Sequence, residues 1–223
     1  MHVLPRAAYA VLALCALTGI ITSWIIGWEG SSGVGGFIFG LVVTPFTQLR
    51  FFTFMSNLLV AISALDLVFR RDWARSWHVV RLTATICIVI TGIVFNLLLD
   101  TGGHAGLPGI NNFFVHILTP ILTPIAWLLF GPRQTTWRRI GWATIIPIVW
   151  LVVTLVRGAI VHWYPYTILD VDTLGAGVSL YIVAILVFFF VFAAAMWLVD
   201  AWRRRRAPRP VADSPATAVL PLD

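Results

Sequence analysis

Two polar residues in otherwise apolar stretches, Thr53 and His116, could carry out nucleophilic chemistry. A threonine hydroxyl is a poor nucleophile until a base removes its proton, and histidine is the usual base near neutral pH. Asn112 lies four residues before His116, on the same face of a helix, so its amide can orient the imidazole. Pro120 lies four residues after His116 and lacks the N–H that would bond the His116 carbonyl. We therefore expect the helix to open or kink there, which would make room for a ligand.

Three further polar side chains stand in the apolar stretches: Asn57, on the same stretch as Thr53, and Asn96 and Arg157 on two others. A helix rises 1.5 Å per residue, so counting from one end of each stretch places these three and the threonine–histidine pair in one thin layer. Such a layer would form a polar pocket near one membrane surface. Within it, Asn57, Asn96 or the Ser56 hydroxyl could donate a hydrogen bond to a reaction oxyanion.

Each of these residues also has a simpler interpretation. A threonine in a membrane helix often bonds the carbonyl four residues earlier in its own helix. The histidine and the two asparagines could hydrogen-bond between helices, and Arg157 could extend toward lipid headgroups. The common depth of all five residues favours the pocket.

The composition excludes an ordinary soluble domain. The chain has 223 residues, of which 60% are hydrophobic and 11% are charged, whereas soluble domains carry roughly 25% charged residues. Six apolar stretches reach the length of about 20 residues that a membrane-spanning helix needs. We therefore predict an all-α polytopic membrane protein with one six-helix domain over residues 1–202. The predicted helices are 7–28, 49–69, 79–99, 111–130, 140–163 and 178–201.

The arginines predict the orientation of these helices. All 15 basic residues are arginine, and positive charge in short loops marks the cytoplasmic side of a membrane. Only Arg50 and Arg157 lie on one side, while the other 13 flank the opposite helix ends. Both termini are therefore expected on the cytoplasmic side. Arginine-only basic usage with abundant alanine is typical of a GC-rich genome, so we expect a bacterial cytoplasmic membrane.

The remaining segments carry weaker signals. Residues 203–223 are rich in Arg, Pro and Ala and are predicted to form a disordered cytoplasmic tail. Segment 36–46 is apolar but too short to span, so we expect an interfacial or re-entrant piece. The first apolar stretch continues without a cleavage site, so we expect an uncleaved helix. In the inner halves, Asp66 can pair with Arg70, and Asp200 with Arg204.

Three short motifs occur in order at defined helix positions: Phe51-Phe52-Thr53-Phe54, the set Asn112, His116 and Pro120, and Trp163-Tyr164-Pro165-Tyr166 with Leu169-Asp170 just after. Together they resemble the family of androgen-induced and androgen-dependent TFPI-regulating proteins. This resemblance covers roughly residues 9–202 and implies a six-helix membrane hydrolase that cleaves fatty acid esters of hydroxy fatty acids. It further implies that Thr53 is the nucleophile and His116 the catalytic histidine.

These observations together predict a membrane-embedded lipid ester hydrolase without a metal or cofactor. Thr53 would attack the ester carbonyl with His116 as general base, and an acyl-threonine intermediate would follow. The partners would be a lipid or fatty-acyl ester and the surrounding membrane lipids. Arg157 would bind a carboxylate of the substrate, because arginine binds carboxylates in a bidentate manner.

Other classes of function compete with this interpretation. The same scaffold could bind a lipid or small molecule without cleaving it, or transport one, although internal inverted repeats typical of transporters are absent from the sequence. A haem protein would need two facing histidines at matched depth, and His162 lies at the extreme end of its stretch. The arginine cluster at 203–206 fits a stop-transfer signal that contacts anionic lipid, so nucleic acid is not an expected partner.

Overall fold

The computed structural model describes residues 3–29, 44, 46–69, 77–132 and 135–206. These residues form helices, and no β-strand occurs among them. Six helical spans in this part of the chain are long and apolar enough to cross a membrane, as predicted. They are Val3–Trp28, Phe52–Phe69, His78–Leu99, Gly106–Phe130, Trp137–Val161 and Val171–Arg205.

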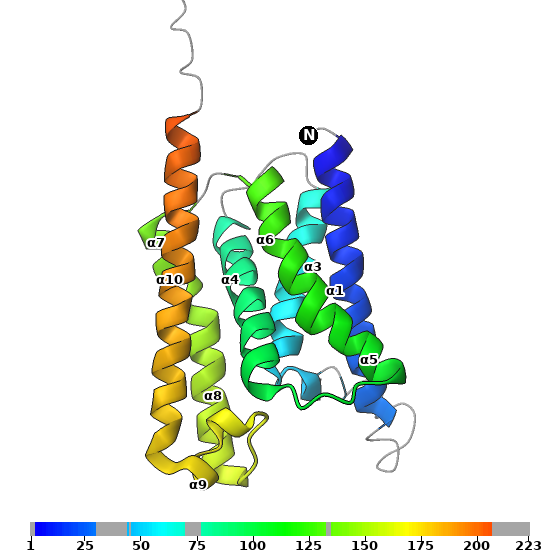
Figure 1. Cartoon of the computed structure of the whole chain (residues 1–223), viewed down its shortest axis with the longest axis vertical. Helices are drawn as coiled ribbons and strands as arrows, with labels where there is room; N and C mark the ends of the chain where they lie inside the picture. Colours follow the sequence, from blue (N-terminus) through cyan, green and yellow to red (C-terminus); the bar gives the residue numbers. More distant parts are fainter. Residues whose placement is uncertain (1–2, 30–43, 45, 70–76, 133–134, 207–223) are drawn as a thin grey trace, which may run out of the picture.

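Four of the spans form a tight group in which α4 (His78–Val94) is central. Every residue from Arg81 to Gly92 is buried. On one side of α4 lie α1 (Val3–Glu29), α3 (Phe52–Phe69) and α6 (Thr119–Phe130) (Figure 1). Small buried residues such as Ala16 and Ala61 join the first two of these helices, and small residues let membrane helices approach closely.

The last two spans cover the other side of α4. They consist of α7 (Trp137–Ala143), α8 (Ile145–Val161) and α10 (Val178–Arg205), with short helical turns η4 (Thr167–Leu169), α9 (Val171–Leu174) and η5 (Gly175–Gly177) between them. Much of α8 and α10 is exposed and apolar, including Val152, Ile160 and Leu180. An exposed apolar face suits contact with lipid chains.

The beginning of α1 and the end of α10 lie at the same end of the bundle (Figure 1). An even number of spans requires this arrangement. The helix of α10 continues to Arg205, so the first residues of the predicted tail are helical, and residues 207–223 lie outside the described part. Segment 36–46 also lies outside it, except for Thr44 and Phe46.

Two buried acidic groups have partners at this end. Asp66 forms an ion pair of 2.5 Å with Arg81 of α4, whereas Arg70, its expected partner, is not among the described residues. Asp200 accepts a hydrogen bond from the backbone N–H of Thr135 at 2.8 Å and pairs with Arg203 at 3.7 Å. Asp200 thus pairs with Arg203, three residues on, and not with Arg204, its expected partner; both positions lie about one helical turn from Asp200.

At the opposite end, two spans depart from regular α-helix. The α4 helix continues into a π-helical turn, η2 (Phe95–Leu99), and α5 (Gly106–Asn112) continues into another, η3 (Phe113–Leu118), before α6 begins. A π-helical turn inside an α-helix is uncommon and is often found at functional sites. His116 lies in η3, so the predicted opening of the helix at this histidine is confirmed, in the form of a π-helical turn.

Candidate functional site

Thr53 and His116 are in direct contact. The Thr53 hydroxyl oxygen lies 3.1 Å from His116 Nε2, which joins the start of α3 to η3. Other threonines of the bundle, such as Thr18 and Thr83, bond the carbonyl four residues earlier in their own helix. Thr53 does not, and its hydroxyl faces the imidazole instead.

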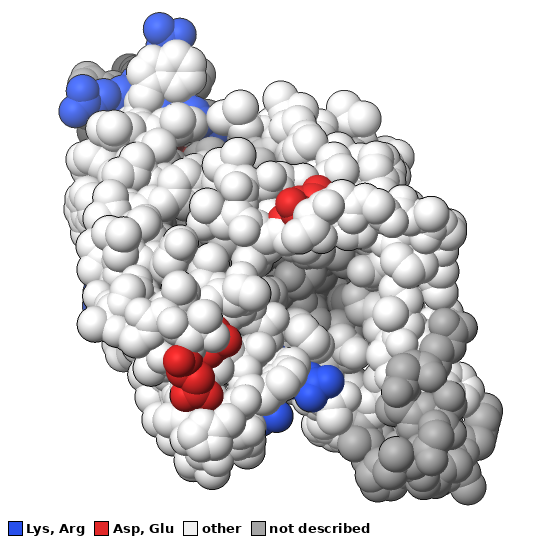
Figure 2. Space-filling model, turned by 60° about the horizontal axis from the view of Figure 1, so that its bottom comes forward, with Lys and Arg blue, Asp and Glu red and all other residues white. Residues whose placement is uncertain are grey.

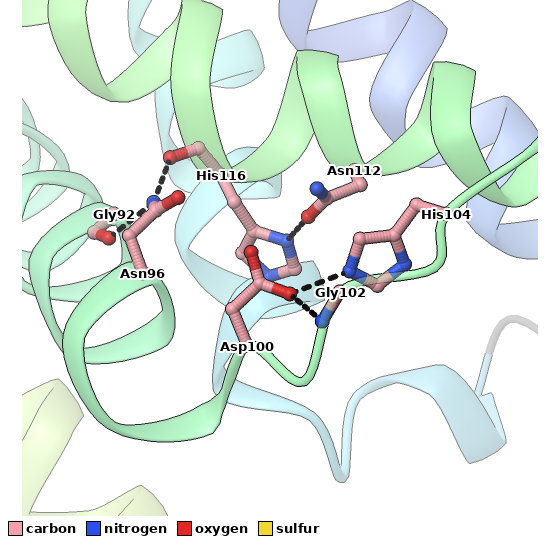
Figure 3. Close-up of polar contacts among 7 residues, drawn as sticks. All are labelled: Gly92, Asn96, Asp100, Gly102, His104, Asn112 and His116. Carbon is pink, nitrogen blue, oxygen red and sulfur yellow. Dashed lines mark hydrogen bonds and ion pairs between the residues drawn. The ribbon is translucent and has the colours of Figure 1, made fainter.

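The imidazole of His116 is held on two sides. Its Nδ1 donates to the Asn112 side-chain oxygen at 2.8 Å, as the spacing of four residues predicted (Figure 3). The Phe95 ring lies face to face with it, with centroids 3.4 Å apart and planes inclined by 2°. Because Nδ1 carries the proton in this arrangement, Nε2 presents a lone pair to the Thr53 hydroxyl. This is the tautomer that a general base requires.

The backbone at His116 is stabilised by Asn96. Pro120 has no N–H to offer the His116 carbonyl, and the Asn96 side-chain amide donates to that carbonyl at 2.9 Å (Figure 3). The same amide donates to the Gly92 carbonyl at 2.7 Å. Asn96 thus fixes the position of the histidine and makes no contact with the Thr53 hydroxyl.

Ser56 and Asn57 follow Thr53 near the start of α3 and are completely buried. The Ser56 hydroxyl donates to the Thr53 carbonyl at 3.0 Å, and Asn57 Nδ2 donates to the same carbonyl at 2.8 Å. Asn57 also reaches the Val115 carbonyl at 3.4 Å. Asn57 therefore joins the first turn of α3 to η3, and Ser56 joins it to α4 through the Thr91 hydroxyl at 2.8 Å. Neither residue lines the wide or the narrow cavity described below, where it could donate to an oxyanion.

Tyr166 is a site residue that the sequence analysis did not single out. Its hydroxyl oxygen lies 3.3 Å from the Thr53 hydroxyl and accepts the Thr53 backbone N–H at 3.2 Å. That N–H is free because it belongs to the first turn of α3. Burial raises the pKa of Tyr166 above its usual value, against the opposing effect of the Thr53 hydrogen bonds. The phenol therefore stays protonated and can donate to a substrate. Its only sequence signal was its place in the motif at 163–166.

Thr53 lies where two cavities meet. A wide cavity of about 720 Å³ contains His116, Arg50, Gln48 and Asn111 in its wall. A narrow one of about 110 Å³ lies between α4, α8 and α10, and its wall is almost entirely apolar. Thr53 and three other residues line both: Phe95, Leu99 and Tyr166.

Arg157, the predicted carboxylate-binding residue, does not line either cavity. It is half-buried, and its guanidinium lies over the Trp163 ring, 5.1 Å from the centroid. Arg50 lies over the same ring at 4.7 Å and does line the wide cavity. The structure thus places Arg50, rather than Arg157, in the wall that a ligand would contact.

A short loop borders the site between η2 and α5. Asp100 accepts hydrogen bonds from the Gly102 N–H and from His104 Nε2, both at 2.8 Å (Figure 3). These bonds lower the pKa of Asp100. Gly102 and Gly103 adopt positive φ angles of 74° and 78°, which glycine tolerates without strain. The loop therefore has a defined shape beside His116.

Among the described residues, no group of three or more His, Cys, Asp or Glu side chains is arranged to hold a metal ion. Comparisons of the chain with protein-family models, with curated proteins and with solved structures find no match. The resemblance drawn from the three motifs therefore stays a prediction.

Proposed function

We propose that this protein is a membrane-embedded lipid ester hydrolase with Thr53 as nucleophile and His116 as general base. The observation that carries the proposal is the 3.1 Å contact between the Thr53 hydroxyl and His116 Nε2, with Asn112 on the other ring nitrogen. A nucleophile, a base and a residue that orients the base form the arrangement typical of covalent catalysis. Thr53 lies in α3, His116 in η3 and Asn112 at the end of α5.

In the first half of the reaction, the Thr53 hydroxyl oxygen attacks the ester carbonyl carbon while His116 Nε2 takes the hydroxyl proton. The tetrahedral intermediate collapses when the bond from carbon to the alcohol oxygen breaks, and His116 returns the proton to that oxygen. In the second half, water attacks the acyl-threonine ester and gives a proton to His116. The second tetrahedral intermediate collapses when the bond from carbon to the Thr53 oxygen breaks, and His116 returns its proton to that oxygen. The products are one acid and one alcohol.

The developing oxyanion needs a donor, and Tyr166 is the best placed. Its oxygen already accepts the Thr53 N–H, so its own proton is available for another acceptor. The hydroxyl lies 3.3 Å from the nucleophilic oxygen, within reach of a carbonyl oxygen bound to that atom. A single donor of this kind contributes roughly 10²–10³-fold to the rate.

The surroundings of Thr53 favour an amphiphilic ester as substrate. The narrow cavity offers apolar walls from Val94, Leu151 and Ile185, which suit a hydrocarbon chain. The wide cavity offers polar and charged groups. Such a pair of environments agrees with the substrate class that the family resemblance implies, fatty acid esters of hydroxy fatty acids.

The test is hydrolysis of long-chain esters by the purified protein in detergent or vesicles. Thr53→Ala should abolish activity and labelling by an acylating or phosphonylating activity probe, because the attacking oxygen is gone. His116→Ala should lose roughly 10²–10⁴-fold, the usual contribution of a general base. Thr18→Ala and His162→Ala, at residues that line neither cavity, serve as matched controls and should keep wild-type rates. Activity of Thr53→Ala equal to wild type would refute the proposal.

The same two cavities would also suit a protein that binds an amphiphile without cleaving it. Their polar and apolar walls would hold such a ligand whether or not Thr53 reacts. In that case the wild type would bind the ester with no turnover and no probe labelling, and Thr53→Ala would bind it equally well. Turnover by the wild type separates the two functions.

A further inference from the structure

The position of Thr53 between two unlike cavities gives an ester two distinct directions in which to extend. Thr53 and Tyr166 belong to the walls of both cavities. An ester has two halves, the acyl chain and the alcohol, joined at the carbon that the nucleophile attacks. The chemistry of each cavity therefore selects which half it takes.

The narrow cavity is suited to the acyl chain. It lies among α4, α8 and α10, and its wall has no charged residue among those described. Ile90, Leu186 and Phe189 are among the residues that line it. Such a wall matches a hydrocarbon chain in polarity and offers no partner for a charged group, so an acyl chain could stay there until water attacks the acyl-threonine intermediate.

The wide cavity carries an unpaired cation. Arg50 is not paired with any acidic group among the described residues, and its Nε is buried without a hydrogen-bond partner. Arg157 shares the Trp163 ring with it. Burial first, and then repulsion from Arg157, lower the pKa of Arg50. Two guanidinium groups on one ring repel each other, and an anion between or beside them would relieve that repulsion.

This end of the molecule is hollowed, and basic groups lie at the rim of the hollow (Figure 2). Gln48, Asn111 and Ser23 add hydrogen-bonding side chains to the wall of the wide cavity. Arg50 lies three residues before Thr53 in the chain. A charged group bound at Arg50 would therefore be close to an ester at Thr53 and would set its position.

We propose that the substrate lies across Thr53 with its acyl chain in the narrow cavity and an anionic group of its alcohol half in the wide cavity, against Arg50. This inference rests on the proposed hydrolase function and adds the orientation of the substrate and a residue that determines specificity. When the ester is cleaved, the anionic alcohol leaves through the wide cavity, beside His116. Its departure makes room for the water that attacks the acyl-threonine.

The first experiment tests the anion. Three esters share one acyl chain, and their alcohol halves end in a free carboxylate, the methyl ester of that carboxylate, or a phosphate. Wild type should prefer an anionic ester over the neutral one by about tenfold or more in kcat/KM, through KM, as expected for charge-assisted bonds to arginine. The preferred anion tells whether the group is a fatty-acid carboxylate or a phosphate of a lipid headgroup.

Arg50→Gln should remove most of this preference, because glutamine keeps hydrogen-bonding capacity but has no charge. Arg138→Gln, an exposed arginine of α7, is the matched control and should keep the preference. Equal kcat/KM of wild type for the anionic and neutral esters would overturn the assignment of Arg50. So would an Arg50→Gln variant that keeps the full preference.

The second experiment tests the acyl chain. Leu186→Phe adds volume to the wall of the narrow cavity and should shift the preferred acyl chain toward shorter lengths. Val187→Phe makes the same kind of change at the next residue of α10, which is 57% exposed and outside the cavity, and should leave the chain-length profile as in wild type. Identical profiles for wild type and both variants would overturn the placement of the chain.

Binding to Thr53→Ala separates failure of this inference from failure of the proposed function. This variant should bind the intact anionic ester, and adding Arg50→Gln or Leu186→Phe should weaken binding of the anionic or long-chain ester respectively. If wild type shows no turnover but these effects on binding appear, the hydrolase function is wrong and the binding orientation holds. If turnover occurs without either effect, the orientation is wrong and the function holds.

Discussion

The Asn96 side-chain amide donates to the His116 carbonyl at 2.9 Å, and this carbonyl is the one that Pro120 cannot bond. The contact joins η2 to η3 at the level of Thr53 and His116. A buried carbonyl without a partner costs about 1–3 kcal/mol. Asn96 therefore satisfies the group that the proline leaves open, and it holds the π-helical turn that carries the imidazole.

Replacing Asn96 by leucine, which has a similar size, should displace the imidazole from Thr53. We expect kcat to fall several-fold or more with little change in KM, and stability to fall by about 1–3 kcal/mol. Ester hydrolysis and thermal unfolding in detergent measure the two effects. Asn96→Gln should recover part of the rate. A variant with reduced stability and an unchanged kcat would limit Asn96 to a structural role.

Tyr166→Phe removes one oxygen and keeps the ring that packs near Phe51 and Trp150. If the phenol donates to the oxyanion, kcat should fall by roughly 10²–10³-fold. Tyr164→Phe is the control, because its ring packs on Gly158 and none of the contacts described here joins it to Thr53. Equal kcat values for the two variants would argue against Tyr166 as oxyanion donor.

Gly92 allows α4 to approach the start of α6. A methyl group added there would lie 2.6 Å from Pro120 Cβ and 3.2 Å from the His116 carbonyl oxygen. Gly92→Ala should therefore destabilise the protein by about 1–3 kcal/mol, as overpacking usually does, and reduce activity by moving η3. Gly141→Ala, which would meet no atom within 4 Å, should have neither effect. Thermal unfolding of the two variants checks the prediction.

The loop at Asp100 should depend on pH. The pKa of Asp100 is lowered by its bonds to the Gly102 N–H and His104, so the folded loop binds protons less readily than the unfolded chain. The stabilisation is present above the ordinary carboxyl pKa and is lost as the pH falls through the lowered value. Protection of the Gly102 amide against hydrogen exchange, corrected for intrinsic rates, should fall in that acidic window. In Asp100→Asn, protection should be weak and should not change with pH.

The orientation predicted from the arginines is tested by accessibility. In a variant lacking Cys15 and Cys87, a cysteine replacing exposed Thr101 should react with an impermeant thiol reagent in intact cells. A cysteine replacing Ala212 should react only after the membrane is opened. The reverse labelling pattern would place the candidate site at the cytoplasmic surface, and would exclude access to it from outside.

The six spans could be predicted from the sequence because the property that defines them is local. In lipid, every backbone N–H and C=O must be bonded within its own helix, so an apolar stretch of sufficient length specifies its own structure. The bond from Asn112 to His116 was predictable for the same reason, since both lie on one stretch at a spacing of four. The effect of Pro120 was predictable because it follows from a missing N–H.

The contacts between helices were only partly predictable. Depth in the bundle follows from a rise of 1.5 Å per residue, and it correctly brought Thr53 and His116 to one level. Depth does not tell which way a side chain points around its helix or which helix it faces. For this reason Asn57 and Asn96, expected to face a ligand, bond backbone carbonyls instead.

The sequence by itself therefore determined the class of protein and the spans, and it indicated Thr53 and His116 as candidate site residues, because these depend on composition and on neighbours within one helix. Only the tertiary structure decided that Tyr166 reaches the Thr53 hydroxyl, and that Arg50 rather than Arg157 lines the wide cavity. Those relationships join residues far apart in the chain or on different helices. They depend on how the helices rotate and pack against each other, which small residues and buried hydrogen bonds set together across the whole bundle.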